Sequence, residues 1–274
     1  LYRDKVFVII VLCILVSIKA IIGFHVGRTG DTDSLLLLFL TAFLYYFLKY
    51  WDFNQKRSIY LASFFFGLAF YTKSFAAFLI LPGVFTYMMI TARKKIVSKE
   101  ILYAFLLTLL IISSWVFLAT LGNRSTEPDS NLVSRMFSTD LVRRFTDRNF
   151  EAGYDPFYIF HVLDMSFNIW NYILYLGGFI AIYRLVFLKK SWSLKRDKLL
   201  LIALLIAASY AIMLSLSINK HRWYLAPAVP FFAILTAEFI YFLKAKYSWI
   251  IPAFILLFAS LTIKRFIELN KPDT

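Results

Sequence analysis

The sequence predicts an all-α, polytopic transmembrane helix bundle of about nine spans with one long extracytoplasmic loop. Hydrophobic residues make up 61% and aromatic residues 19% of the 274 positions, well above the norm for soluble domains. The apolar runs are about as long as a bilayer crossing requires, and lipid tolerates only backbone that is hydrogen-bonded internally. The basic residues behind the net charge of +14 cluster between these runs, so we expect basic cytoplasmic loops and no nucleic-acid partner.

The predicted spans follow one another with short polar connections and one long one. They cover residues 6–24, 35–50, 58–72, 75–91, 101–121, 167–188, 199–218, 223–243 and 248–263. Cys13 is the only cysteine and lies inside the first run, which excludes a disulfide framework and a cysteine zinc site within this chain.

Residues 58–91 could form one helix or two helices broken at Lys73-Ser74. One helix of this length would measure about 51 Å, against a hydrocarbon core of about 30 Å. Only the break places the basic clusters around 49–57, 93–99, 189–198 and 244–246 on one side, as the positive-inside rule requires. We therefore predict a tight hairpin at Lys73.

This topology places residues 25–34, the Lys73 turn, the loop 122–166, residues 219–222 and the C-terminal tail outside. Most acidic residues fall in these outer segments, where no topological rule calls for them. We expect any chemistry on this face. A hairpin needs only one or two turn residues, and the stretch 27–34 carries Arg28, Asp31 and Asp33 in excess of that need.

Three other outer features are candidates for binding. Lys73 is either an interfacial lysine that reaches water or a point charge for a lipid phosphate. Residues 219–224 place Lys220, His221 and Arg222 beside Trp223 and Tyr224, an arrangement suited to an anion, with Arg222 able to grip a phosphate bidentately. Pro227 and Pro230 then disturb the following helix.

The loop 122–166 is about 45 residues long, which exceeds a simple connector and suits an ordered lid over a site or a solvated linker. His161 near its end is either a structural interface residue or part of a site. Lys19, Asp164 and Glu238 lie in or near apolar spans; such charges are functional candidates, although Lys19 and Glu238 could simply reach water or pair.

Walker, dinucleotide-binding and His-Glu-x-x-His motifs are absent from the sequence. Energy for a reaction on the outer face would therefore arrive on an activated lipid. Two acids and a nearby lysine could bind a divalent cation, but the ligand set is too poor to assign one, and no cofactor is predicted.

Three stretches together resemble the GT-C membrane glycosyltransferases, in particular the protein O-mannosyltransferase and lipid A aminoarabinose transferase group. Residues 27–36 (GRTGDTDSLL) resemble its Ala-Arg-x-Gly-x-x-Asp-x-Leu stretch, and residues 67–74 (GLAFYTKS) its Gly-Leu-Ala-x-Leu-Thr-Lys-Gly. Residues 217–227 (SINKHRWYLAP) resemble its Ser-x-x-Lys-x-x-x-Tyr-x-x-Pro. The resemblance spans roughly residues 5–240.

The resemblance implies transfer of a sugar from a polyprenyl-phosphate donor to a lipid, protein or glycan acceptor on the outer face of a bacterial inner membrane. It implies that Asp33, with Asp31 beside it, belongs to the catalytic cavity. Lys73 and the stretch from Lys220 to Tyr224 would hold the donor phosphate, and the loop 122–166 would help to form the acceptor site. Arg28 and His161 complete the expected substrate-binding set.

Two departures from the family pattern stand out. The family's first long outer loop, with its acidic pair, has no counterpart here, so we expect a GT-C-like domain over 1–274 that lacks its N-terminal span and that loop. Whether this piece is active alone is left open. Serine also replaces the family's glycine after Lys73. A transporter or flippase of an anionic lipid and an O-antigen-ligase-like enzyme are the alternative interpretations.

Overall fold

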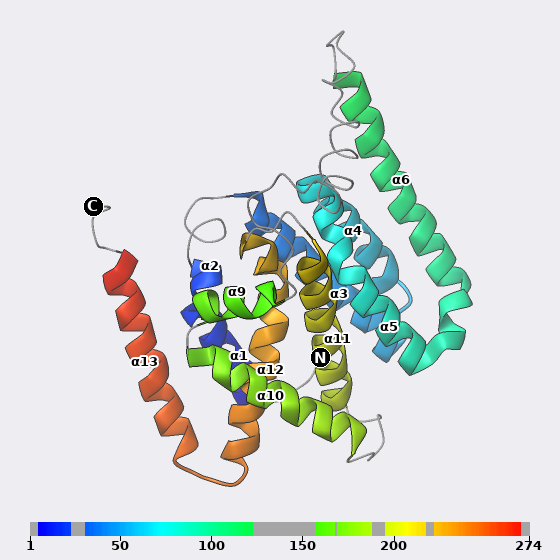
Figure 1. Ribbon diagram of the computed structural model, residues 1–274. Helices are drawn as coiled ribbons and strands as arrows, with labels where there is room; N and C mark the ends of the chain where they lie inside the picture. The colour runs from blue at the N-terminus through cyan, green and yellow to red at the C-terminus, as the bar shows by residue number, and fades with distance from the viewer. Residues whose placement is uncertain are drawn as a thin grey trace.

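A computed structural model of the chain describes residues 5–22, 31–122, 157–167, 169–187, 195–217 and 222–269, and these residues form helices and turns without any strand (Figure 1). Six helical segments among them are long and apolar enough to cross a membrane: 32–53, 58–97, 99–121, 169–186, 197–216 and 224–244. The chain is thus an integral membrane protein with a polytopic helical bundle, as predicted, whereas the count of nine spans is not confirmed.

The first predicted span, 6–24, is interrupted within its described part, residues 6–22. Helix α1 (Lys5–Ser17) ends before Ile18, and α2 (Lys19–Ile22) follows. The Ser17 hydroxyl donates to the Ile14 carbonyl (2.8 Å) and accepts a hydrogen bond from Trp170 Nε1 (2.8 Å). A serine that bonds back to its own helix weakens the next helical turn, which accounts for the interruption at this point.

Helices α3 (Thr32–Phe53) and α4 (Ser58–Lys73) form an antiparallel hairpin. Helix α3 ends at Asn54, whose φ of 56° lies in the left-handed region that asparagine tolerates, and whose N–H bonds to the Lys49 and Tyr50 carbonyls. Aromatic rings fill the seam between the two helices, with Phe43 and Phe66 5.2 Å apart.

The predicted break at Lys73-Ser74 is confirmed. The chain continues as a 3₁₀ segment, η1 (Ser74–Ile80), then α5 (Leu81–Ala92) and η2 (Arg93–Val97). Lys73 contacts Asp33 at the beginning of α3, whereas Thr91 accepts a hydrogen bond from Trp51 Nε1 (2.7 Å) at its end. Helix α5 therefore returns along α3 in the direction opposite to α4.

Helix α6 (Lys99–Gly122) runs along the outside of α4 and marks the right edge of Figure 1. The Ser63 hydroxyl donates to the Ala104 carbonyl (2.8 Å), and a Cβ at Gly67 would lie 2.5 Å from the Ile111 side chain. Most of α6 remains exposed, with large apolar side chains such as Leu110 and Leu121 facing outward as a lipid-facing helix requires.

The second half of the chain contains α9 (Tyr158–Phe167), α10 (Ile169–Val186), α11 (Lys195–Leu216), η5 (Arg222–Ala228), α12 (Val229–Lys244) and α13 (Ile250–Leu269). Helix α9 occupies the end of the predicted loop 122–166, so that part is helical; the rest of the loop lies outside the described residues. Pro227 lies inside η5 and Pro230 begins α12, so the expected disturbance by the two prolines is confirmed.

Helix α12 forms the centre of the bundle, packed against α1, α10 and α11, while α13 lies at the edge opposite α6 (Figure 1). A Cβ at Gly177 would overlap the Leu235 carbonyl oxygen. Only glycine permits this approach of α10 to α12, because any side chain would overlap the backbone of α12.

The ends of α3 give the bundle two polar ends. Asp33 and Asp52 are 19 residues apart, or about 29 Å at 1.5 Å per residue, which matches the hydrocarbon thickness of a bilayer. We call these the Asp33 end and the Asp52 end. Helix α11 begins at the Asp52 end, where Lys198 pairs with Asp52, and the following η5 packs against α3.

Candidate active site

The two predicted acids at the beginning of α3 have different environments. Asp31 is the N-cap: its carboxylate accepts a hydrogen bond from the Thr32 N–H (2.6 Å) and one from the Thr32 hydroxyl (3.2 Å). Asp33 lies in the first turn, where the helix dipole favours a negative charge, and it is fully buried. Asp31 thus starts the helix, and Asp33 points a charge into the bundle.

Lys73 is the last residue of α4, and its side chain points toward Asp33. The helix stops there because Ser74 adopts φ 41° and ψ −119°, a region that glycine enters freely and serine rarely does. Glycine would adopt this conformation at little cost, whereas the Cβ of Ser74 makes it strained. Backbone strain of this kind tends to occur at functional sites.

Asp33 and Lys73 form an ion pair with 2.6 Å between Oδ1 and Nζ. The carboxylate side chain is 1% exposed, and the lysine side chain is 21% exposed. Asp33 Oδ2 is buried and has no hydrogen-bond partner among the described residues. A buried carboxylate oxygen without a partner is costly and rare, and it marks a place where another group is expected to bind.

Tyr224 joins this pair from η5, far away in the sequence. Its ring lies 5.3 Å from Lys73 Nζ, within the range of a cation–π contact. Three predicted site residues, Asp33, Lys73 and Tyr224, therefore meet at the Asp33 end from α3, α4 and η5. The sequence predicts all three on one face of the membrane, but it does not predict the ion pair between Asp33 and Lys73.

The other predicted residues are placed less completely. Arg28, Lys220 and His221 lie outside the described residues. Arg222 is the first residue of η5, two positions before Tyr224, but only its backbone is described. His161 is exposed on α9, which packs against α2, α10 and α11; within the described part of the chain it makes no contact with the Asp33 pair.

An apolar cavity of about 390 Å³ lies between α4, η1 and α6, and its lining does not include Asp33, Lys73 or Tyr224. Its lining combines aromatic rings with Ser63 and Thr108 and includes Phe70 and Phe75, which precede and follow Lys73 in the chain. The cavity lining thus includes residues three positions before and two positions after the lysine, and its apolar character suits a hydrocarbon chain.

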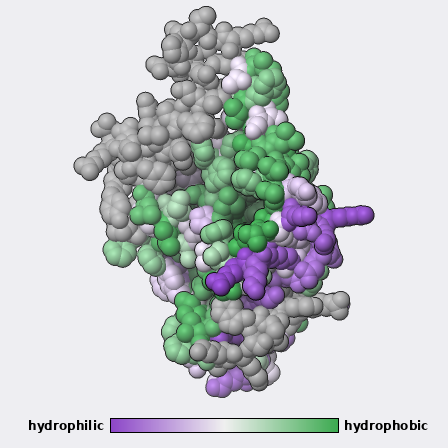
Figure 2. Space-filling model, turned by 90° about the vertical axis from the view of Figure 1, so that its right-hand side faces the viewer, coloured by the Kyte–Doolittle hydropathy of each residue, from purple (hydrophilic) through white to green (hydrophobic). Residues whose placement is uncertain are grey.

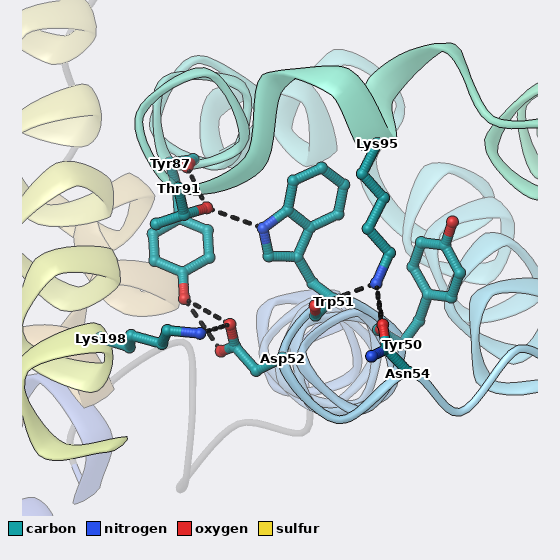
Figure 3. Close-up of polar contacts among 8 residues, drawn as sticks. All are labelled: Tyr50, Trp51, Asp52, Asn54, Tyr87, Thr91, Lys95 and Lys198. Carbon is teal, nitrogen blue, oxygen red and sulfur yellow. Dashed lines mark hydrogen bonds and ion pairs between the residues drawn. The ribbon is translucent and has the colours of Figure 1, made fainter. Parts of the chain in front are cut away.

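The Asp52 end holds a second buried acid that the sequence analysis did not single out (Figure 3). Asp52 accepts hydrogen bonds from the Tyr87 hydroxyl on both oxygens (3.0 and 2.9 Å) and pairs with Lys198 Nζ at 3.0 Å. The signal in the sequence was the presence of an acid, Asp52, on the side predicted to be basic. Its partners, on α5 and α11, could not be identified without the fold.

Two neighbouring ion pairs account for another intramembrane acid. Arg184 on α10 contacts Glu238 on α12 (3.0 Å) and Asp197 at the start of α11 (3.1 Å). Glu238, one of the charges considered functional from the sequence, is thus held in a contact that joins three helices. Its pairing fits the structural alternative.

Metal binding has little support in the described part of the chain. No group of three histidine, cysteine, aspartate or glutamate side chains there lies close enough together to hold a metal ion. Lys73 already occupies one oxygen of Asp33, so this carboxylate could offer a divalent cation one oxygen, and the remaining ligands would have to come from other groups.

An integral membrane helix bundle with a buried aspartate–lysine pair at one end fits a membrane glycosyltransferase of the GT-C type. Comparison supports this class, because the family model described as dolichyl-phosphate-mannose-protein mannosyltransferase matches residues 6–117. The matched segment contains Asp33 and Lys73 and covers less than half of the chain. The match supports the resemblance inferred from the motifs at 27–36 and 67–74, whereas the third motif, at 217–227, lies beyond the matched segment.

A protein of Aquifex aeolicus (strain VF5), described as uncharacterized, is 28% identical over 218 residues. The alignment covers 78% of this chain but only 39% of that relative, so the chain spans well under half of the relative's length. No solved structure gives a significant match.

Proposed function

We propose that this chain is part of a glycosyltransferase that moves a sugar from a polyprenyl-phosphate donor to a lipid, protein or glycan acceptor. The observation that carries the proposal is the buried Asp33–Lys73 pair with one carboxylate oxygen left unpartnered. Because basic residues collect at the Asp52 end, the Asp33 end faces the extracytoplasmic side, and a bacterial inner membrane is the proposed location.

The two charges suit the two halves of such a transfer. The acceptor hydroxyl attacks the anomeric carbon of the sugar and loses its proton as the new carbon–oxygen bond forms. The unpartnered oxygen of Asp33 can accept a hydrogen bond from that hydroxyl, orient it and take the proton. An aspartate in this position would act as base or positioning group without moving any helix.

The leaving group is the lipid phosphate, which departs with the electron pair of the broken bond. Lys73 offers a positive charge in a partly dry site, where it stabilises the developing charge more strongly than it would in water. Tyr224 holds the ammonium from the other side. Lys220, His221 and Arg222 precede this tyrosine, and we expect them to add charge around the phosphate.

The neighbouring cavity supports a lipid-linked donor rather than a soluble one. Its lining is apolar, and Phe70 and Phe75 bring it close to Lys73 in the chain. A prenyl chain lying between α4 and α6 would leave its phosphate near the lysine. Arg28 and His161 remain candidates for contacts with the sugar or the acceptor.

The test is a transfer assay on the full-length protein in proteoliposomes with a polyprenyl-phosphate-linked sugar. Lys73→Ala and Arg222→Ala are compared with Lys246→Ala, an exposed lysine in the turn between α12 and α13. We expect both site variants to lose about 100-fold or more of the transfer rate, in line with losses of a charge-stabilising group, and the control to retain it.

Membrane insertion and thermal stability of the variants are measured in parallel. Wild-type rates in both site variants would contradict the proposal. Movement of intact labelled donor across the vesicle membrane, with its sugar linkage unchanged, would instead support a transporter.

A further inference from the structure

A strongly basic surface lies at the Asp52 end, away from the proposed active site. It is formed by five exposed cations in the α3–α4 turn and in η2 with the residues after it: Lys56, Arg57, Arg93, Lys94 and Lys99. We call it the basic surface. Figure 2 shows hydrophilic side chains gathered beside a largely hydrophobic face on the side of the molecule formed by α4, α5 and α6.

The two segments of the basic surface are fastened to each other. Lys95 Nζ donates to Asn54 Oδ1 (2.7 Å) and to the carbonyls of Tyr50 (2.8 Å) and Trp51 (3.0 Å), so it caps the end of α3 (Figure 3). The Tyr50 hydroxyl lies 2.9 Å from Ser98 Oγ. The fold therefore presents the cations of both segments as one unit.

The positive charge of this surface is largely uncompensated. The stretches 49–57 and 92–100 contain two acids, Asp52 and Glu100. Asp52 is buried and paired with Lys198, and Glu100 pairs with Lys56 at 2.7 Å. The pairing raises the pKa of Lys56, because its ammonium donates a hydrogen bond to Glu100. Arg57, Arg93, Lys94 and Lys99 are left without a nearby described carboxylate.

One apolar side chain projects among these cations. Val97, the last residue of η2, is 88% exposed, whereas the preceding Ile96 packs against the core. An exposed valine between lysines is unfavourable in water. It is typical of segments that insert an apolar residue into the lipid surface while their cations contact headgroups.

We propose that the basic surface binds the headgroups of anionic phospholipids. Its distance from Asp33 along α3 matches one hydrocarbon thickness, so it lies at the headgroup level of the opposite leaflet. The positive charge of the surface favours an anionic partner. The exposed Val97 favours a lipid surface over a soluble polyanion, because an apolar side chain gains from contact with lipid. The bound lipid would tie the turns at the ends of α3 and α5 to the membrane interface.

The test measures lipid retained by the detergent-purified full chain after addition of phosphatidylglycerol or phosphatidylcholine, using native mass spectrometry. The variant is Arg93→Gln/Lys94→Gln/Lys99→Gln, whose three residues make none of the internal contacts described above. The matched control, Lys5→Gln/Lys244→Gln/Lys246→Gln, removes the same charge from the start of α1, the end of α12 and the α12–α13 turn.

We expect the wild type and the control to retain phosphatidylglycerol in preference to phosphatidylcholine, and the variant to retain about tenfold less phosphatidylglycerol. Val97→Ser, which keeps every charge, should also reduce retention. Equal retention of the two lipids by the wild type would overturn the proposal, as would an equal loss in the control. Binding of a short oligonucleotide that Val97→Ser leaves unchanged would assign the surface to a soluble polyanion instead.

Discussion

Each end of α3 carries an aspartate–lysine ion pair, but the two aspartates differ in how completely their oxygens are hydrogen-bonded. At the Asp52 end, Tyr87 and Lys198 occupy both oxygens of the carboxylate. At the Asp33 end, Lys73 occupies one oxygen and the other is buried without a partner in the described structure. A fully bonded buried network rigidifies a fold, whereas an incomplete one costs stability unless a ligand completes it.

This difference distinguishes a fully bonded pair from an incompletely bonded one without reference to sequence motifs. The Asp52 pair joins α3, α5 and α11, and Lys198 is next to Asp197, which ties α11 to Arg184 on α10. The beginning of α11 therefore fastens both halves of the bundle at that end. The Asp33 pair joins α3 to α4 and leaves one carboxylate oxygen without a partner in the described structure.

The largest effect is expected for Asp33→Asn. The amide is isosteric but cannot take a proton from the acceptor, so transfer should fall by about 100-fold or more. Lys73 loses its counter-ion, but the substitution also removes the cost of a buried and incompletely bonded charge, so stability should fall by about 1 kcal/mol, less than in Asp52→Asn. The transfer assay in proteoliposomes and thermal unfolding in detergent measure the two effects separately. A large stability loss with normal transfer would make this pair structural.

Asp52→Asn should show the reverse pattern. It leaves Lys198 without its counter-ion, and we expect a loss of about 2 kcal/mol of folding free energy, moderated because the lysine side chain is 28% exposed. Transfer per folded molecule should remain close to that of the wild type. Denaturant unfolding in detergent gives the first quantity. Loss of transfer at unchanged stability would refute the structural assignment.

Much of this architecture was accessible from the sequence because the membrane restricts the choices. Hydropathy and charge sufficed to predict the helical class, the reversal at Lys73 and the gathering of Asp33, Lys73 and Tyr224 on one face. The 3₁₀ geometry of η1 and the interruption at Ile18 were not accessible. They depend on Ser74 and on the contact between Ser17 and Trp170, which are set by tertiary packing.

The contacts of Asp52 with Tyr87 and Lys198 were not predicted from the sequence. Asp52, Tyr87 and Lys198 are each ordinary residues at the end of a span. Their significance comes from distances across three helices, and no spacing in the sequence encodes those distances.

Removal of a single hydroxyl tests how much hydrogen bonding to Asp52 contributes to stability. Tyr87→Phe deletes the donor to Asp52, and we expect a loss of about 1 kcal/mol of stability. The matched control is Tyr210→Phe on α11, because the Tyr210 hydroxyl is buried and has no hydrogen-bond partner in the described structure. That change should be neutral or stabilising. Equal losses in the two variants, measured by thermal unfolding, would mean that hydrogen bonding to Asp52 contributes little.

Asp31→Asn is expected to have the smallest effect and separates the two acids at the beginning of α3. Asparagine is as good an N-cap as aspartate, so its carbonyl can still accept the bond from the Thr32 N–H, and stability should change by less than about 0.5 kcal/mol. If the role of Asp31 is to cap the helix, the transfer rate stays within about twofold of the wild-type rate, because a change of less than about 0.5 kcal/mol corresponds to a factor of about two. A loss as large as that of Asp33→Asn would instead show that the exposed carboxylate takes part in the reaction, because only its charge has been removed.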